Sequence, residues 1–328
     1  MINMIGELII LFTIIFTSFL YGVLVGNYEL FPFTILSKCK NYIDIFANLI
    51  RPTDRKEVSY PNIEKVSKDP ELSVHFIDVG NKKSDCFLIN IDGGKTVLID
   101  AGRESHGPGL CEYINKMGVN EIDLLLLTHY HGDHYGGIQD IVGEFKIKKV
   151  LLPKYWLDLE EHHKEAVMNE LKGISSELVE INSNYEIGMD AQLEIIGPQK
   201  KYTGDFYTGN ENSTVCRLNH DLLTVMFMGD ATEISEMDIL DSEVDIESNI
   251  LKVGHHGYPG TTSIQFIEEV NPSEAVITTQ GKYSKCRKKI IDRLNYFADA
   301  DCYLTNKSGT IVVKAFEGSS YEIITSDD

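Results

Sequence analysis

Beyond residue 70, short apolar runs and alternations predict strands, and longer amphipathic stretches between them predict helices. The expected strands span residues 73–79, 86–91, 96–100, 122–127, 150–152, 178–181, 193–196, 214–218, 222–228, 249–253, 275–278, 302–304 and 310–316. The expected helices span residues 110–117, 138–142, 157–171, 234–240, 262–270 and 289–297. Two successions of strands, each accompanied by helices, predict a mixed α/β domain over residues 71–328.

The start of the chain has a different pattern, because residues 8–25 form an almost unbroken apolar run without a charged side chain. Roughly 20 such residues cross a bilayer as a helix. A cleaved signal peptide would need a positive segment before the run, whereas the only charge there is Glu7. A buried core helix would show a polar face. We therefore expect residues 1–26 to form an uncleaved, single-pass transmembrane anchor.

Residues 27–70 connect the expected anchor to the expected domain. Residues 27–50 alternate aromatic and aliphatic side chains with Lys and Asn. This pattern fits either a juxtamembrane amphipathic helix at the membrane interface or a stalk packed on the domain. Residues 51–70 contain three prolines and many charges, which is typical of a linker.

The strongest chemical signal follows the strand expected at residues 122–127. Residues 128–134 read Thr-His-Tyr-His-Gly-Asp-His, so three imidazoles and one carboxylate fall close together. Both groups bind divalent metals of the zinc type. Gly132 permits a tight turn that would let these side chains converge at the strand end. The alternative is a solvent-exposed histidine-rich loop, but such a loop would not require an apolar strand in front of it.

Further motifs occur along the chain in the order that one large family uses. They are Asp-Val-Gly at residues 78–80, Ile-Asp-Ala-Gly at 99–102, Asn-Glu-Asn-Ser at 210–213, Met-Gly-Asp-Ala at 228–231 and Lys-Val-Gly-His-His-Gly at 252–257. With these motifs the chain resembles the metallo-β-lactamase superfamily over roughly residues 72–315. It is most similar to the ComEC/Rec2-type hydrolase domain, and phosphorylcholine esterases share many of these motifs. The resemblance implies a four-layer αββα sandwich with two divalent ions, zinc being favoured over manganese.

The resemblance also implies a set of metal ligands. The first ion would be bound by His129 and His131, the second by Asp133, His134 and His255, and both would be bridged by Asp230. The neighbouring His256 is expected to point elsewhere, toward the substrate, with His256 in place of His255 as the ligand left as the alternative.

Two further residues are expected to support this site. Many relatives have a third histidine for the first ion, and its position here falls near Asn212, which would be a weak ligand. Asp100, at the end of an expected strand, would accept a hydrogen bond from a ligating imidazole and fix its orientation. The alternative for Asp100 is an ordinary turn residue.

Charge and cysteine content narrow the interpretation further. The formal net charge of -20 is unusual for a protein that binds nucleic acid. The acidic sequence contains one basic cluster, which includes Lys282, Lys285 and Arg287. These side chains could bind a phosphate chain. The alternative is that they form a solvated helix start. The six cysteines contain no Cys-x-x-Cys pair and are expected to be buried free thiols rather than disulfides.

These features predict a membrane-anchored, metal-dependent hydrolase, with a phosphodiesterase or nuclease as the leading interpretation. Two bound ions would lower the pKa of a coordinated water and so supply hydroxide at neutral pH. Asp133 or Asp230 would orient this nucleophile, and His256 is a candidate for protonating the leaving group. The same site could instead serve an acyl or lactone substrate, as in lactonases, thioesterases or β-lactamases. Lost ligands would favour a non-catalytic, membrane-tethered binding module.

Partners and location follow from the same reasoning. The expected partners are a phosphodiester or another hydrolysable substrate, with nucleic acid as one candidate, and the membrane through the N-terminal helix. Lys38, Lys40 and Arg51 follow the anchor and favour a cytoplasmic domain. The resembled families act outside the cytoplasmic membrane, so the face of the membrane stays open.

Overall fold

The computed structural model describes residues 70–78, 80, 82–188, 190–279, 285–316 and 321–326, which belong to one compact unit. The expected anchor, and all of the juxtamembrane segment and linker except Pro70, lie outside the described residues. Within the described part of the chain, no helix has the length and apolar character needed to cross a bilayer.

The first of two mixed sheets has eight strands in the order β15-β14-β1-β2-β3-β4-β5-β6. They are β1 (Leu72–Phe76), β2 (Phe87–Ile91), β3 (Thr96–Ile99), β4 (Glu121–Leu126), β5 (Lys146–Leu152), β6 (Ser175–Leu178), β14 (Ile311–Ala315) and β15 (Glu322–Ile324). Strands β3 to β6 are parallel to one another, and the remaining pairs of neighbours are antiparallel.

The second sheet has seven strands in the order β13-β12-β11-β10-β9-β8-β7. They are β7 (Asn184–Glu186), β8 (Ala191–Gly197), β9 (Val215–His220), β10 (Leu223–Phe227), β11 (Ile250–Lys252), β12 (Glu274–Ile277) and β13 (Asp301–Leu304). Strands β10 to β13 are parallel, and β7 to β10 pair antiparallel. Each sheet therefore has a parallel half, whose strand ends can present loops at one edge.

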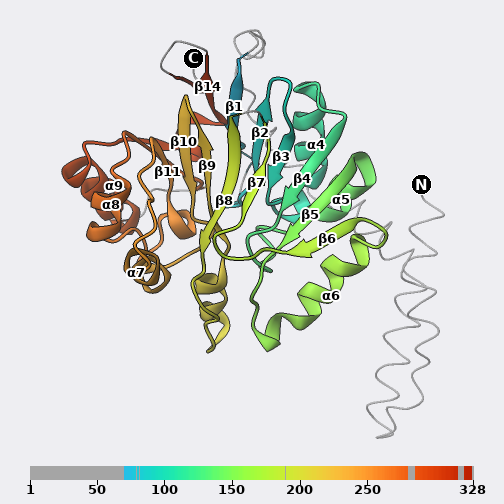
Figure 1. The fold of residues 1–328 in the computed structure, drawn as a ribbon, viewed down its shortest axis with the longest axis horizontal. Coiled ribbons are helices and arrows are strands. Elements are labelled where there is room, and N and C mark those ends of the chain that lie inside the picture. The colour runs from blue at the N-terminus through green and yellow to red at the C-terminus, as the bar shows by residue number, and fades with distance from the viewer. Residues whose placement is uncertain are drawn as a thin grey trace, which may run out of the picture. The chain divides into compact units, whose positions relative to one another are not determined.

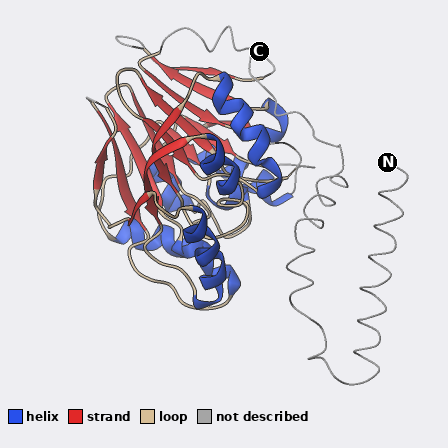
Figure 2. Cartoon of the chain, turned by 90° about the vertical axis from the view of Figure 1, so that its right-hand side faces the viewer, coloured by secondary structure: helices blue, strands red, loops and turns tan. Residues whose placement is uncertain are grey.

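Helices cover the outer face of each sheet, as Figure 1 shows. One core packs the first sheet against α4 (Gly107–Lys116), α5 (Ile138–Glu144) and α6 (Glu161–Glu170). Another core packs the second sheet against α7 (Glu233–Asp241), α8 (Ile264–Val270) and α9 (Lys285–Phe297). A short helix, α10 (Thr305–Ser308), joins β13 to β14. In Figure 2 the strands run side by side across the upper left of the domain, and the helices lie to their right and below them.

The largest core lies between the two sheets and contains side chains from both of them. At its centre the rings of Phe76, Phe87 and Phe227 pack against one another, with centroid separations of 5.3 to 6.0 Å. Burying each such ring contributes roughly 1.5–3 kcal/mol. This core fixes the two sheets face to face and thereby sets the positions of the loops that follow their strands.

The elements differ from expectation mainly where the sequence is polar. The strand expected at residues 178–181 lies earlier, as β6, whose side chains are all exposed and so show no apolar alternation. The pattern does not predict β7 or β15, which have three residues each. The single helix expected at residues 157–171 is two elements, because a 3-10 turn, η3 (Asp158–Glu160), precedes α6.

The cysteines for which the structure describes a side chain are free thiols, as expected. Cys86, Cys111 and Cys216 are buried, and Cys302 is half-buried. Burial raises the pKa of the Cys216 thiol above its ordinary value, which keeps it protonated and unreactive.

Candidate metal centre

The loops that carry the candidate ligands follow parallel strands of both sheets. In the first sheet β4 leads into the segment that contains His129, His131 and His134. In the second sheet β10 leads into Asp230, and β11 leads into a left-handed turn, η5 (Gly254–Gly257). The centre is therefore assembled from segments that are far apart in the chain and meet only through the packing of the two sheets.

One cluster of ligand atoms consists of His129, His131 and Asp230, whose donor atoms all lie within 4.8 Å of one another. These residues are 2%, 8% and 1% exposed. The Nε2 atom of His129 lies 3.9 Å from Oδ2 of Asp230. Two imidazoles and a carboxylate in this arrangement match the donor set of a zinc-type ion.

A second cluster lies on the other side of the same aspartate and contains Asp85, His134, Asp230 and His256. Oδ1 of Asp230 is 3.3 Å from Nε2 of His134 and 3.4 Å from Nε2 of His256. Oδ2 of Asp230 faces His129 in the first cluster. The two oxygens of one carboxylate therefore face different clusters, which is the geometry of a carboxylate that bridges two ions.

Several polar atoms at the centre have no partner of their own, although they are buried. Nε2 of His129, His134 and His256 and Oδ1 of Asp230 have no hydrogen-bond partner among the described residues. An unsatisfied buried polar group costs about 1–3 kcal/mol, and native structures contain few of them. Their convergence is explained if these atoms bind cations, so the residues present fit a pair of divalent ions.

Hydrogen bonds on the outer side of the imidazoles turn Nε2 toward the centre. Oδ2 of Asp100 lies 2.7 Å from Nδ1 of His134, and Asp100 also accepts hydrogen bonds from the backbone N–H and hydroxyl of Thr128. This is the position expected for Asp100. Thr278 plays the same part for His256, with its carbonyl oxygen 3.0 Å from Nδ1, and Oδ1 of Asp85 lies 3.3 Å from the same nitrogen. Partners of this kind fix the tautomer and the orientation of a ligating histidine.

Burial and neighbouring charges shift the pKa values of these groups in opposite directions. Burial lowers the pKa of His129 well below its ordinary value, and the neighbouring histidines add to this shift. Burial also acts to lower the pKa of His134, but Asp230 and Asp100 outweigh it and raise this pKa well above the ordinary value. Burial acts to raise the pKa of Asp230, and the surrounding histidines outweigh it, so Asp230 stays ionised. The centre thus holds negative charge that can attract a cation.

The two adjacent histidines of η5 differ from expectation, because His256 and not His255 belongs to the second cluster. Both have left-handed backbone angles, with φ of 43° at His255 and 53° at His256. The side chain of His256 is fully buried and joins the second cluster, whereas that of His255 is 19% exposed, with Nε2 3.8 Å from Oδ2 of Asp230. The expectation of His255 as the ligand and His256 as the substrate-facing residue is corrected accordingly. A Cβ on Gly254 would lie 2.6 Å from the carbonyl oxygen of Ala231, so this turn also requires glycine.

Three other expectations need correction or fall outside the structure. The side-chain amide of Asn212 is occupied by Tyr202, since it accepts from the backbone N–H (2.9 Å) and donates to the carbonyl (3.0 Å). Asn212 therefore stabilises a loop and is not placed as a ligand. Arg287 is 7% exposed and donates from Nε to the carbonyl oxygen of His256, so it supports the turn and does not face solvent. Lys282 and the side chain of Lys285 lie outside the described residues.

Basic side chains beside the centre come from other segments than expected. Lys83 and Arg103 lie 3.1 and 3.0 Å from Oδ2 of Asp133, and their side chains are 25% and 30% exposed. Asp133, expected as a ligand of the second ion, is not among the residues of the second cluster and lies at its edge, with Oδ2 3.7 Å from Nε2 of His256. Burial acts to raise the pKa of Asp133, but His134 and Lys83 outweigh it and hold the value at about 2. The basic residues of the loop after β1 signal Lys83 in the sequence, whereas Arg103 follows β3 and no sequence pattern marks it.

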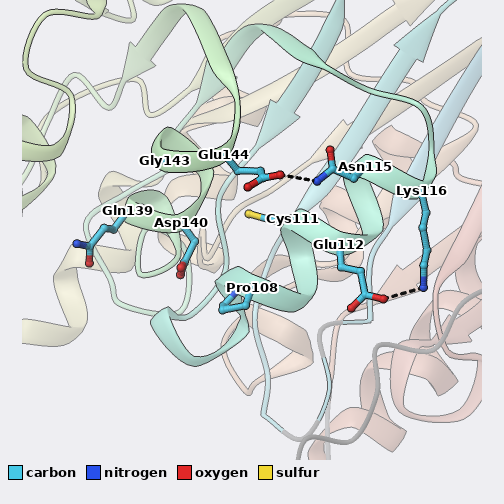
Figure 3. A pocket seen from close by; sticks show the side chains of 9 residues that line it. All are labelled: Pro108, Cys111, Glu112, Asn115, Lys116, Gln139, Asp140, Gly143 and Glu144. Carbon is cyan, nitrogen blue, oxygen red and sulfur yellow. Dashed lines mark hydrogen bonds and ion pairs between the residues drawn. The ribbon is translucent and has the colours of Figure 1, made fainter. Parts of the chain in front are cut away.

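A hollow between α4 and α5 is not part of this centre (Figure 3). It is lined by Pro108, Cys111, Glu112, Asn115, Lys116, Gln139, Asp140, Gly143 and Glu144, and none of the cluster residues is among them. Burial raises the pKa of the Cys111 thiol to about 12, so this thiol is protonated at neutral pH and is a poor nucleophile.

Comparison with known proteins agrees with this geometry. Residues 79–281 match the metallo-β-lactamase superfamily. ComE operon protein 3 of Bacillus subtilis is 26% identical over 259 residues, which cover 74% of this chain and 33% of that protein. Recombination protein 2 of Haemophilus influenzae is 23% identical over 265 residues, which cover 76% of this chain and 29% of that protein. The chain thus spans about a third of the length of these curated relatives.

The fold is also similar to that of a solved structure of a CmlA β-hydroxylase variant. The TM-score is 0.51 at 14% sequence identity, and the match covers 75% of this chain and 54% of the other. The family match covers more than half of the chain, and the two His/Asp clusters lie within it. The chain therefore belongs to the metallo-β-lactamase superfamily and has the buried metal centre of a metal-dependent hydrolase.

Proposed function

We propose that this protein is a membrane-anchored phosphodiesterase that uses two divalent ions, zinc or manganese, and that nucleic acid is among its substrates. The proposal rests on one observation: the cationic side chains of Lys83 and Arg103 lie beside the two clusters of ligand atoms. Lys83 and Arg103 both reach Asp133 and are both partly exposed, so they can also contact a phosphate oxygen. An uncharged lactone or thioester would give these two cationic side chains no anion to bind.

The bound ions would supply a Lewis acid and lower the pKa of water at the site. Residues of the chain would hold the ions, orient the water and set the supply of protons. Asp230 faces both clusters and would hold the ions together. Asp133, fixed by Lys83 and Arg103, would accept a hydrogen bond from the attacking water. Burial lowers the pKa of His255 to about 4, although Asp230 opposes this shift, so His255 is neutral at pH 7 and is a poor proton donor to the leaving group.

Two further observations support the substrate class and the location. One relative is named Recombination protein 2, which favours a substrate of the nucleic-acid type. The uncharged run at residues 8–25 supports a single membrane anchor. The net charge of -20 would weaken the binding of long polyanions, so we expect short or single-stranded substrates to be preferred over duplex DNA.

The test uses the full chain, purified in mild detergent and loaded with Mn²⁺ or Zn²⁺. We expect it to cleave bis-p-nitrophenyl phosphate and single-stranded DNA, and we expect Asp230→Asn to lower the rate by at least about a hundredfold, because stabilisation by the ions is worth several kcal/mol. A β-lactam, a lactone and a thioester serve as comparison substrates. Cleavage of these alone would replace the proposal with an acyl hydrolase, and no cleavage of any substrate would favour a binding module.

A further inference from the structure

A glutamate that is absent from the expected ligand set lies beside the first cluster. Glu160 is the last residue of η3 and is only 2% exposed. Its Oε1 atom lies 3.3 Å from Nε2 of His131. Nothing in the local sequence marks this residue, because it stands in a charged stretch that is typical of a solvated helix start.

The other oxygen of this carboxylate is held by the backbone. Oε2 of Glu160 accepts a hydrogen bond of 2.6 Å from the backbone N–H of Leu157, which closes the first turn of η3. Oε1 is buried and accepts no hydrogen bond from the described residues. Apart from its contact with the imidazole of His131, this buried oxygen makes no hydrogen bond to the described residues, so a cation at this point would satisfy it.

A glycine on a second segment leaves room for the same oxygen. A Cβ on Gly209, in η4 (Phe206–Asn212), would lie 2.5 Å from Oε1 of Glu160 and 3.0 Å from Nε2 of His131. Any other residue would push the carboxylate or the imidazole away. Two segments that are far apart in sequence are thus both adapted to hold Oε1 beside His131.

We propose that Glu160 is a ligand of the ion bound by His129, His131 and Asp230, and that it takes the place of the third histidine of many relatives. This inference rests on the proposed function, since it requires that the clusters bind metal. Ligand atoms about 2.0–2.1 Å from one tetrahedral ion stand about 3.3 Å apart, which is the separation between Glu160 and His131. Oε1 of Glu160 is not among the donor atoms of this cluster that lie within 4.8 Å of one another, so the carboxylate would turn toward His129 and Asp230 when the ion binds.

The assignment changes the chemistry of the first ion. Two nitrogens and two carboxylate oxygens form a harder and more negative donor set than three nitrogens and one carboxylate. Such a set binds manganese better relative to zinc than a three-histidine site does. With Glu160 as a ligand, the first ion would be bound firmly. With Asn212 as the expected weak ligand, it would be bound loosely.

The test compares the full chain with Glu160→Gln, Gly209→Ala and the control Glu161→Gln. Glu161 is the adjacent residue, 48% exposed and engaged with Trp156 and Lys164. Glutamine at position 160 keeps an oxygen for the N–H of Leu157, so a purely structural role would survive. The readouts are ions per chain from elemental analysis, and the affinities for Mn²⁺ and Zn²⁺ from calorimetric titration of metal-free protein.

We expect Glu160→Gln to weaken one of the two binding events by at least about tenfold, more for Mn²⁺ than for Zn²⁺, and to leave the other unchanged. Gly209→Ala should have the same effect with Glu160 intact, and Glu161→Gln should have none. If wild-type protein binds two ions and cleaves phosphodiesters, but both variants bind them equally well, the inference is wrong and the proposed function stands. If wild type binds two ions but cleaves only acyl substrates, the proposed function is wrong, and the variants still decide the inference. If wild type binds no ion, both are wrong.

Discussion

Histidines in this protein are buried for two different reasons, and single residues show the difference. At the centre, the Nε2 atoms of His129 and His134 have no hydrogen-bond partner among the described residues. His75, in β1, is equally buried, but Nδ1 lies 2.8 Å from the hydroxyl of Tyr113 and Nε2 lies 3.0 Å from that of Ser73. The ring of His75 is therefore satisfied without a metal, and we assign it to stability.

This assignment predicts a pH dependence. Burial, helped by Lys314, lowers the pKa of His75 from 6.5 to about 3. Between these pH values the unfolded chain binds a proton at His75 that the folded chain does not. The contribution of neutral His75 to the free energy of unfolding is therefore complete above pH 6.5. It is lost as the pH falls, by about 1.4 kcal/mol per pH unit. His75→Gln should be less stable than wild type at pH 7, and the gap should narrow toward pH 5. Urea unfolding at pH 7, 6 and 5 measures it, and a gap that stays constant would contradict the assignment.

How much the sequence predicts also depends on the residue. The spacing of His129, His131 and His134 after a strand was sufficient to place them, because their relation is local. The choice of His255 over His256 for the second cluster was wrong, because neighbouring side chains point in different directions and a left-handed backbone decides between them. Glu160 was missed, because its contact with His131 depends on how η3 packs in three dimensions.

Among the structural elements, a buried ion pair ties the loop after β1 to a strand of the other sheet. Lys252, the last residue of β11, is fully buried, contacts Asp85 and donates a 2.9 Å hydrogen bond to the carbonyl of Gly229. Asp85 also accepts from the hydroxyl of Thr278, after β12. Burial acts to raise the pKa of Asp85, but Lys252 and His256 outweigh it and hold this pKa well below the ordinary value. This pair therefore positions His256 as well as joining two sheets.

Removing the lysine should cost far more than removing a surface partner. Lys252→Met leaves Asp85 charged and buried, and we expect it to lower the free energy of unfolding by about 3–5 kcal/mol. The double variant Asp85→Asn/Lys252→Met should recover part of this loss. Lys288→Met, which removes an exposed pair with Asp292, is the control and should cost less than about 1 kcal/mol. Denaturant unfolding compares the four proteins, and equal losses in Lys252→Met and Lys288→Met would refute the account of this pair.

The predicted elements succeeded where burial imposes a pattern on the sequence. The strands of the inter-sheet core alternate or run apolar, and most of them were expected within a few residues of their bounds. The edge strands β6 and β7 lie in polar sequence, with mostly exposed side chains, so the pattern carried no signal for them. The pairing of the sheets could not be derived from periodicity, because it depends on contacts between distant segments; it was expected only from the family resemblance.

At the scale of the whole molecule, the protein is strongly acidic and brings histidines from loops of both sheets together at one buried centre. Both sheets contribute to this centre, and Asp230 is the residue that the two clusters share. The core between the sheets does not include these ligands, so we expect the fold to form without metal and the centre to be completed by it. The central claim is that one carboxylate joins two ion sites.

Elemental analysis of purified wild type, His131→Ala, His256→Ala and Asp230→Ala tests this claim most directly. The account predicts two divalent ions per wild-type chain, about one in each histidine variant, and almost none in Asp230→Ala, with folding of each variant checked by circular dichroism. A wild-type chain that retains no ion, or an Asp230→Ala variant that retains both, would contradict it.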